Sequence, residues 1–193
     1  MIEDEQRYRA SAYGLLAALL RAPPERAVLD HVVSLSPSGD TDADTLSNAM
    51  TALAEAAKRA DPGALEDEYH ELFIGLGRGE VVPYGSWYMT GFLMEQPLSD
   101  LRDDLARLGF AKNEEVSEPE DHVAAIFEVF SVMISDAVSL TEQQKFFEIH
   151  MLPWIGRFFV DLGKAKTAQF YQAVAQFGAA YNELEKQYLS MRS

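Results

Sequence analysis

Apolar residues recur at helical spacing along almost the whole chain, and this pattern constrains the fold more than any other feature. Large apolar side chains three and four positions apart fall on one face of an α-helix, whereas a half-buried strand alternates at every second position. Such stripes cover residues 8–19, 46–57, 98–108 and 170–188, and no strand-type alternation of useful length appears. The sequence therefore predicts an all-α fold, a bundle-like arrangement of about eight or more helices.

The chain has the length and the apolar content of one domain. Its 193 residues are 48% hydrophobic, enough for an ordinary buried core. We expect a single all-helical domain over residues 1–193, with a long loop near residues 75–88 and a charged linker near residues 111–117. The loop is indicated by Gly75, Gly77 and Gly79, whose alternation interrupts the helical rhythm.

Two local signals predict helix boundaries in the last third of the chain. Thr141 and Gln144 have the spacing of a capping box, in which each side chain satisfies an N–H group at the helix start. Pro153 predicts a kink or break between His150 and Trp154, because proline cannot donate the next helical hydrogen bond.

The charge balance and the absence of cysteine exclude several classes of function. Without cysteine there are no disulfides, no thiolate metal sites and no cysteine nucleophile. The 31 acidic and 16 basic residues give a net charge of −15, which repels nucleic-acid phosphates and anionic lipids but attracts a cationic partner. The acidic start is unlike an export signal, and no apolar run reaches the ~20 residues that span a bilayer. We therefore expect a cytoplasmic protein without nucleic-acid partners or stable membrane insertion.

Acidic residues crowd into residues 118–122, which read Glu118, Pro119, Glu120, Asp121 and His122. Proline and acids are favoured in the first turn of a helix, so these acids could simply cap the helix that follows. Carboxylates on a rigid turn can also accept paired N–H bonds from an arginine guanidinium, and His122 would add a switchable donor or acceptor. Both interpretations fit the sequence.

Aromatic residues follow the glycine-rich loop, where Tyr84, Trp87 and Tyr88 are costly to leave exposed. They either pack the loop onto the bundle or form a wall of an apolar peptide groove.

An enzymatic alternative is a metal- or nucleotide-dependent hydrolase built on the cluster from Glu118 to His122. The spacing of that cluster matches neither HExxH nor an EF-hand loop, and the glycines near residue 77 lack the Gly-Lys-Ser/Thr of a P-loop. We therefore expect no metal site and no enzymatic activity. A third interpretation, an oligomerisation module, would use the stripe over residues 170–188.

Several segments, in order and spacing, resemble the TorD/DmsD-like chaperones of molybdenum-containing oxidoreductases. Residues 118–122 match the family's E-P-x-D-H signature, and residues 147–158 are similar to its H-L-x-P-W-x-x-R-F stretch. Residues 69–73 and 83–88 agree as well. One departure is Met89-Thr90-Gly91, where relatives often show an acidic residue and a serine, and this leaves the client enzyme open.

The resemblance implies a non-enzymatic cytoplasmic chaperone that binds the twin-arginine signal peptide, and often the body, of a molybdopterin-containing oxidoreductase. Such a chaperone delays export until the cofactor is inserted. Glu118 and Asp121 would engage arginines, His122 would orient the site, and Tyr84 with Pro83 would hold the apolar segment. The partners implied are the leader and the apoenzyme, bound by a monomer or dimer. No resident cofactor is implied, only guanine nucleotide or transient molybdopterin contact. The signal-peptide-binding residues carried over are Leu72, Phe73, Pro83, Tyr84, Ser86, Trp87, Glu118, Pro119, Asp121 and His122.

Overall fold

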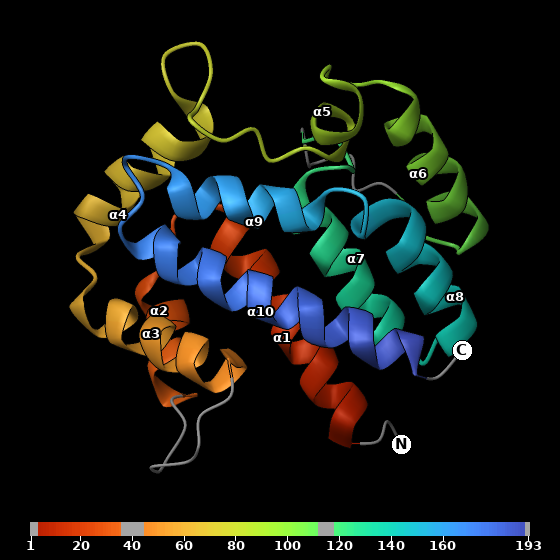
Figure 1. Ribbon diagram of the computed structural model, residues 1–193, viewed down its shortest axis with the longest axis horizontal. Helices are drawn as coiled ribbons and strands as arrows, with labels where there is room; N and C mark the ends of the chain where they lie inside the picture. Colours follow the sequence, from red (N-terminus) through yellow and green to blue (C-terminus); the bar gives the residue numbers. More distant parts are fainter. Residues whose placement is uncertain (1–3, 36–44, 112–117, 192–193) are drawn as a thin grey trace. The chain divides into compact units, whose positions relative to one another are not determined.

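A computed structural model describes residues 4–35, 45–111 and 118–191 of the chain. These ranges are helical with no strand, and their one pairing of extended backbone is an isolated bridge between Tyr84 and His122 (Figure 1). The all-α class predicted from the apolar spacing is confirmed. The elements in chain order are α1 (Asp4–Arg21), α2 (Arg26–Ser34), α3 (Thr45–Arg59), α4 (Pro62–Tyr69), the π-helix η1 (His70–Ile74), α5 (Gly85–Thr90), α6 (Gln96–Arg107), α7 (Val123–Ser135), α8 (Leu140–Phe146), the π-helix η2 (Phe147–Met151), α9 (Ile155–Lys164) and α10 (Phe170–Ser190).

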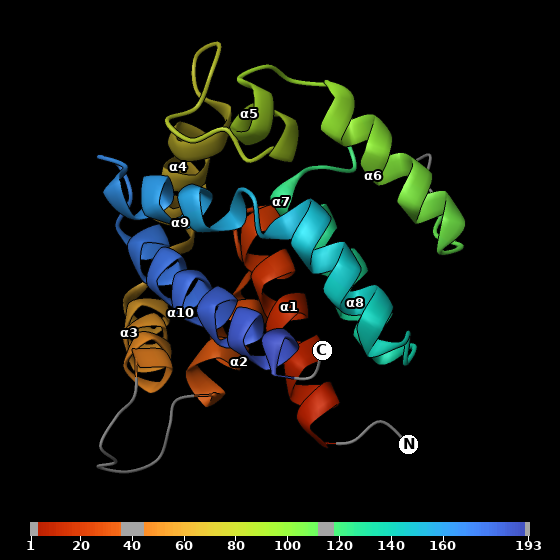
Figure 2. The ribbon, with the colours of Figure 1, turned by 45° about the vertical axis from the view of Figure 1, so that its right-hand side comes forward.

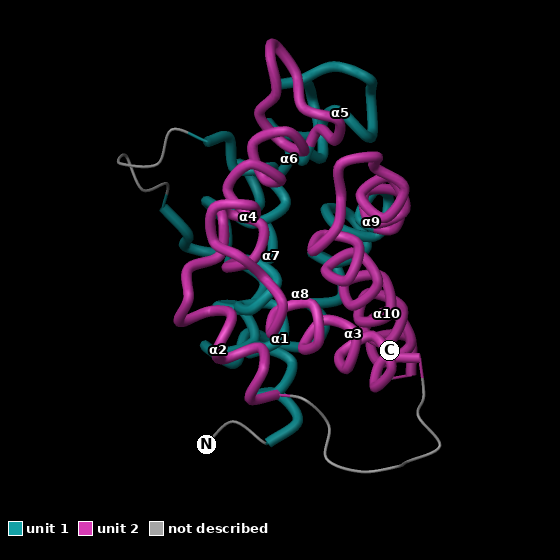
Figure 3. Tube along the Cα trace, turned by 90° about the vertical axis from the view of Figure 1, so that its left-hand side faces the viewer, with its two compact units in different colours: residues 1–17, 83–155 teal, residues 18–82, 156–193 magenta. Residues whose placement is uncertain are grey.

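The chain divides into two compact units, each made of two separate stretches of sequence (Figure 3). Unit 1 comprises Met1–Ala17 and Pro83–Ile155, and unit 2 comprises Ala18–Val82 and Gly156–Ser193. Unit 1 thus holds most of α1 together with α5 to α8, and unit 2 holds α2 to α4, α10 and most of α9. The single domain expected over residues 1–193 stays a prediction. Among the described helices, none has both the length and the apolarity needed to cross a bilayer.

Aromatic side chains from α1, α7 and α8 form the core of unit 1. Tyr13 packs edge-on against Phe130 with ring centroids 4.9 Å apart, and Phe130 stacks on Phe146 at 5.9 Å. The Ser131 hydroxyl donates to the Ala10 carbonyl at 2.8 Å, which ties α7 to α1. In the same unit α6 lies beside α8 (Figure 2).

Unit 2 is organised by polar contacts to α10 as well as by apolar packing against α3. The Glu68 carboxylate of α4 accepts the backbone N–H groups of Gln169 at 2.7 Å and Tyr171 at 2.9 Å. A carboxylate at this position satisfies end groups of α10 and complements its dipole. The Tyr171 hydroxyl donates to the Leu19 carbonyl at 3.0 Å, and burial raises the pKa of this phenol.

The loop predicted near residues 75–88 is shorter than expected, because α5 begins at Gly85. Gly75 adopts a left-handed φ of 57°, and a Cβ on Gly79 would lie 2.3 Å from the Leu72 carbonyl oxygen. The returning chain then donates from the Val81 N–H to that same carbonyl at 2.9 Å. These close approaches require glycine. Most of the linker predicted near residues 111–117 lies outside the described residues.

The two predicted helix boundaries had different outcomes. The capping box at Thr141 and Gln144 is wrong, because Ser139 is the N-cap of α8 and its hydroxyl accepts the Glu142 N–H at 3.3 Å. The break at Pro153 is confirmed, since η2 ends at Met151 and α9 begins only at Ile155.

Candidate functional site

Two segments that the sequence analysis singled out separately lie side by side in unit 1. Tyr84 and His122 pair as an isolated antiparallel bridge. On one side the Gly85 N–H donates to the Asp121 carbonyl at 2.9 Å, and on the other the Val123 N–H donates to the carbonyl before Tyr84 at 2.8 Å. Backbone hydrogen bonds therefore fix the aromatic loop against the acidic turn.

A side-chain contact of Asp121 strengthens this pairing. Its Oδ2 accepts the Ser86 N–H at 2.8 Å, and both residues are buried, at 2% and 0% exposure. The Ser86 hydroxyl in turn accepts the Met94 N–H at 3.2 Å, which tethers the segment after α5. Asp121 Oδ1 is also buried and has no hydrogen-bond partner among the described residues. Asp121 thus holds the start of α5 through its carbonyl and its carboxylate.

His122, and not an acid, caps the helix that follows the turn. Its Nδ1 accepts the Ala124 N–H at 3.2 Å at the start of α7. This hydrogen bond makes Nδ1 the acceptor, so a neutral ring carries its proton on Nε2. The ring also meets Tyr84 edge-on at 5.1 Å. The interpretation in which the acids cap this helix is therefore wrong.

The three acids of the turn have three different environments. Glu118 is exposed, and its Oε2 accepts the Tyr84 hydroxyl at 2.6 Å. Glu120 accepts the Nε and Nη2 groups of Arg102, from α6, at 2.9 and 2.8 Å. Asp121 is buried against the aromatic loop. Only Glu118 combines an exposed carboxylate with an aromatic neighbour.

A small cavity of about 30 Å³ lies beside Asp121, enclosed by residues of α5, α6, α7 and η2. Trp154 lines it, with its Nε1 donating to the His150 carbonyl at 2.7 Å and its ring stacked on Tyr88 at 5.7 Å. A Cβ on Gly85 would lie 3.1 Å from that Nε1, so a larger residue there would crowd the indole. A cavity of this volume can hold water beside Asp121.

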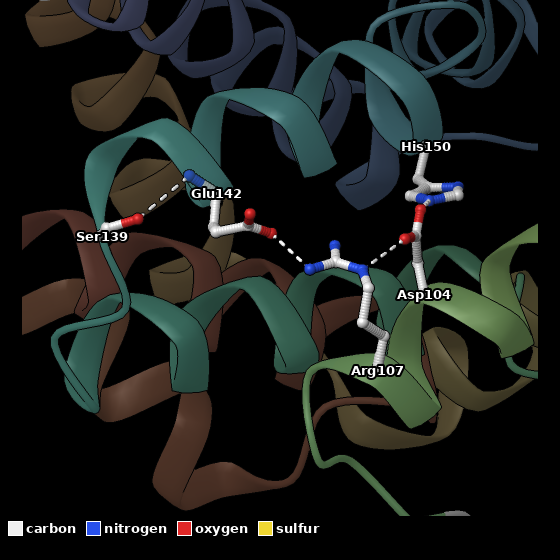
Figure 4. A network of polar contacts seen from close by, with 5 residues as sticks. All are labelled: Asp104, Arg107, Ser139, Glu142 and His150. Carbon is white, nitrogen blue, oxygen red and sulfur yellow. Dashed lines mark hydrogen bonds and ion pairs between the residues drawn. The ribbon is translucent and has the colours of Figure 1, made fainter.

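A network of charged side chains attaches α6 to α8 and η2 (Figure 4). His150 Nε2 contacts Asp104 Oδ2 at 2.8 Å, and Arg107 Nε donates to Asp104 Oδ1 at 3.0 Å. Arg107 also forms an ion pair with Glu142 at 2.8 Å, and Ser139 caps the backbone of Glu142. The His150 hydrogen bond is the main cause that lowers the pKa of Asp104, and Arg107 adds to it against the opposing effect of burial.

Most of the predicted site residues lie in unit 1, in the two segments that the bridge pairs or directly after them. Trp87 is half-buried on α5, and the Pro119 carbonyl accepts the His122 N–H at 3.1 Å within the turn. Leu72 and Phe73 belong to unit 2, where Leu72 is fully buried and Phe73 packs against Tyr171 at 5.4 Å. The residues in unit 1 are Pro83, Tyr84, Ser86, Trp87, Glu118, Pro119, Asp121 and His122.

Sequence reasoning did not identify the apolar segment that follows α5. Phe92, Leu93 and Met94 are 68%, 49% and 72% exposed, although large apolar side chains rarely lie exposed in succession. Met94 also has a left-handed φ of 60°, unusual for a residue with a Cβ, and its N–H is held by Ser86. The signal available in the sequence was the departure at residues 89–91, directly before this segment.

Three side chains of the acidic turn that the hydrolase alternative would use already have partners within the protein. Glu120 is engaged by Arg102, Asp121 by a backbone N–H, and His122 by the start of α7. Within the described ranges, no group of three or more His, Asp or Glu side chains is placed to hold a metal ion.

Comparison with known proteins gives matches over most of the chain. Residues 40–160 match the family model described as nitrate reductase delta subunit. The chain is 28% identical to the chaperone protein TorD of Vibrio atlanticus (strain LGP32) over an alignment of 203 positions, which covers 94% of each protein. It is 30% identical to the Tat proofreading chaperone DmsD of Haemophilus influenzae over 128 residues, 65% of this chain and 61% of that protein.

The fold is also similar to a solved structure. The crystal structure of a redox enzyme maturation protein from Archaeoglobus fulgidus matches with a TM-score of 0.58 and covers 92% of this chain and 93% of its own. At 20% sequence identity this likeness supports the all-α fold alone.

Proposed function

Because this chain belongs to the TorD/DmsD family of molybdoenzyme chaperones, we propose that it binds the twin-arginine signal peptide of a molybdopterin-containing oxidoreductase. Its relatives are named chaperones, and the protein is a chaperone and not an enzyme. In this proposal it acts in the cytoplasm, also contacts the body of the apoenzyme, and delays export until the cofactor has been inserted. The client enzyme would be the oxidoreductase whose leader binds the site described above.

The observation that carries the proposal is the hydrogen bond between the Tyr84 hydroxyl and the exposed Glu118 carboxylate. A twin-arginine leader joins a pair of guanidinium groups to an apolar stretch. Glu118 offers an acceptor for a forked, charge-assisted pair with arginine. Tyr84 holds that carboxylate next to an aromatic side chain. One hydrogen bond therefore joins an acceptor for arginine to an apolar surface, and the leader needs both.

The apolar half of the leader would lie on side chains that follow the bridge. Tyr84 and Trp87 are half-buried, and residues 92–94 add exposed apolar area close to them in sequence. A methionine and an aromatic residue suit an apolar stretch of variable sequence, because such surfaces can adapt to different partners.

Asp121 and His122 contribute to this site by positioning it. The Oδ2 atom of Asp121 accepts the Ser86 N–H, and the residue is only 2% exposed. An incoming arginine would therefore meet Glu118 first. His122 fixes the edge of Tyr84 and the start of α7, which keeps the ring in register with Glu118.

Titration of synthetic leader peptides tests the proposal. A panel of twin-arginine leaders from molybdenum oxidoreductases would be compared with the same peptides carrying two lysines. We expect at least one arginine peptide to bind more tightly than its lysine version, with affinity that falls as salt is added, because exposed charges are screened. Glu118→Gln should weaken that peptide about two- to fivefold, the range for an exposed ion pair.

The matched control is Glu183→Gln, which removes the same charge from an exposed ion pair on α10 in unit 2. It should leave the affinity unchanged. If no arginine peptide binds, or if affinity neither responds to salt nor distinguishes arginine from lysine, the proposed function is wrong.

A further inference from the structure

Glu120 stands at the variable position of the E-P-x-D-H segment, and its carboxylate already holds a guanidinium. Arg102 donates from Nε at 2.9 Å and from Nη2 at 2.8 Å to the same oxygen of Glu120. The Glu120 side chain is only 15% exposed, whereas the Arg102 side chain is 50% exposed. An arginine of the chain therefore makes at the acidic turn the kind of contact that a leader arginine would need.

The surroundings of this pair favour a cation. Asp121, the next residue, lines the small cavity beside α6, and its buried Oδ1 has no hydrogen-bond partner among the residues that the structure describes. An unpartnered, buried carboxylate oxygen is costly, and a nearby positive charge reduces that cost. The hydrogen bond from Glu120 is the main cause that raises the pKa of Arg102, and the charge of Asp121 adds to it. The guanidinium thus interacts with both acids.

We propose that Glu120 is a second arginine acceptor of the leader site and that Arg102 occupies it in the free protein as an internal competitor. This inference rests on the proposed function and names a second acceptor of its site and a residue that tunes its affinity. A leader arginine displaces Arg102 by making the same forked contact to Glu120. Arg102, already half exposed on α6, then turns into water.

The competitor would lower the affinity of every peptide that has to displace it. The free energy needed to release Arg102 from Glu120 belongs to the free protein, so it is the same for an arginine peptide and for a lysine peptide. A lysine ammonium offers a single charged point in place of a planar fork, and it gains less from the same carboxylate. Arginine therefore offsets the displacement better than lysine does, and the preference for arginine comes from Glu120 itself.

The test measures the affinities of five proteins for two peptides. The peptides are the tightest-binding twin-arginine leader from the panel and its two-lysine version. The proteins are the wild type, Arg102→Gln, Glu120→Gln, the double variant Arg102→Gln/Glu120→Gln, and Arg107→Gln. We expect Arg102→Gln to tighten the arginine peptide about two- to fivefold and the lysine peptide by no more, because both peptides are freed from the same competitor.

The other variants separate competition from a general effect of charge. Arg107→Gln removes the same charge from the same helix, but its partners are Asp104 and Glu142, outside the acidic turn. It should change neither affinity as much as Arg102→Gln does. When Glu120 is already replaced by glutamine, the additional Arg102→Gln change should not raise the affinity for either peptide, because the carboxylate for which Arg102 and the leader compete is absent.

An Arg102→Gln protein with unchanged or weaker affinity, or with a gain no larger than that of Arg107→Gln, overturns the inference while leaving the proposed function intact. A wild type that binds no arginine peptide overturns both. Arg102→Lys covers the case in which Arg102→Gln does not fold. It keeps the charge but loses the fork, so it should compete less well than Arg102 and tighten the arginine peptide by less than Arg102→Gln does.

Discussion

Replacing Asp121 with alanine tests whether one buried carboxylate holds the two segments of the candidate site together. The carboxylate accepts the Ser86 N–H at 2.8 Å in a region with 2% and 0% exposure. Alanine leaves that N–H without an acceptor, a loss of about 1–3 kcal/mol. Part of this is offset, because Asp121 Oδ1 has no partner and its burial is itself unfavourable. We therefore expect a loss of about 1–2 kcal/mol.

A loss of this size should be visible in thermal unfolding without abolishing the fold. For a chain of this length each kcal/mol lowers Tm by roughly 2–4 °C, so the variant should melt about 2–8 °C below the wild type. A native stability of about 5–15 kcal/mol keeps it folded at room temperature. Far-ultraviolet circular dichroism should show nearly unchanged helical content, whereas Asp121→Ala combined with His122→Ala should weaken leader binding.

Asp100→Ala is the matched control, because Asp100 lines the same cavity and carries the same charge. Asp100 is exposed and accepts only the Gln96 side chain, at 2.8 Å, so its loss should stay within about 0.5 kcal/mol. If Asp121→Ala melts at the temperature of Asp100→Ala, or if the double variant of Asp121 and His122 binds the leader as the wild type does, the positioning argument is refuted.

Two further predictions concern Gly85 and Asp104, both in unit 1. Gly85→Ala places a Cβ 3.1 Å from Trp154 Nε1 and should cost about 1–3 kcal/mol by overpacking. The control is Gly156→Ala, whose added Cβ meets nothing within 4 Å, so it should be neutral or stabilising by up to about 1 kcal/mol. Equal melting temperatures of the Gly85→Ala and Gly156→Ala variants would contradict the packing argument. The hydrogen bond from His150 is the main cause that lowers the pKa of Asp104 from 3.8. As the pH falls below 3.8, the unfolded chain binds the proton before the folded protein does. The stability that Asp104 contributes is therefore present above this pH and is lost below it. Wild type should therefore lose more Tm on acidification below pH 3.8 than Asp104→Asn does, and parallel acid profiles would contradict this.

The sequence predicted the fold class because helical periodicity is a local property. The stripe at residues 98–108 corresponds to α6, and the proline at position 153 ends a helix wherever the rest of the chain lies. The N-cap of α8 was predicted wrongly for a local reason. Ser139 and Thr141 each precede an acidic or amide residue by three positions, and the sequence does not rank the two.

The site was only partly predictable, because its roles depend on contacts between distant residues. Glu118, Glu120 and Asp121 look equivalent in sequence, yet they contact a tyrosine hydroxyl, an arginine and a backbone N–H. The contact between Asp104 and His150 spans 46 positions and has no local signal. The family motif identified the segment, but only the fold assigns each acid its partner.

The different partners of the three acids explain how a strongly acidic protein can distinguish an arginine peptide from other basic peptides. A net charge of −15 attracts any basic peptide, and such attraction speeds encounter without distinguishing arginine from lysine. Discrimination needs carboxylates whose direction is fixed, so that a planar fork fits and a point charge gains less. Tyr84 fixes Glu118, and in the free protein Arg102 fixes Glu120. The acids of the turn thus differ from the remaining surface acids in being oriented by neighbours, and this is why we assign recognition to them and only attraction to the others.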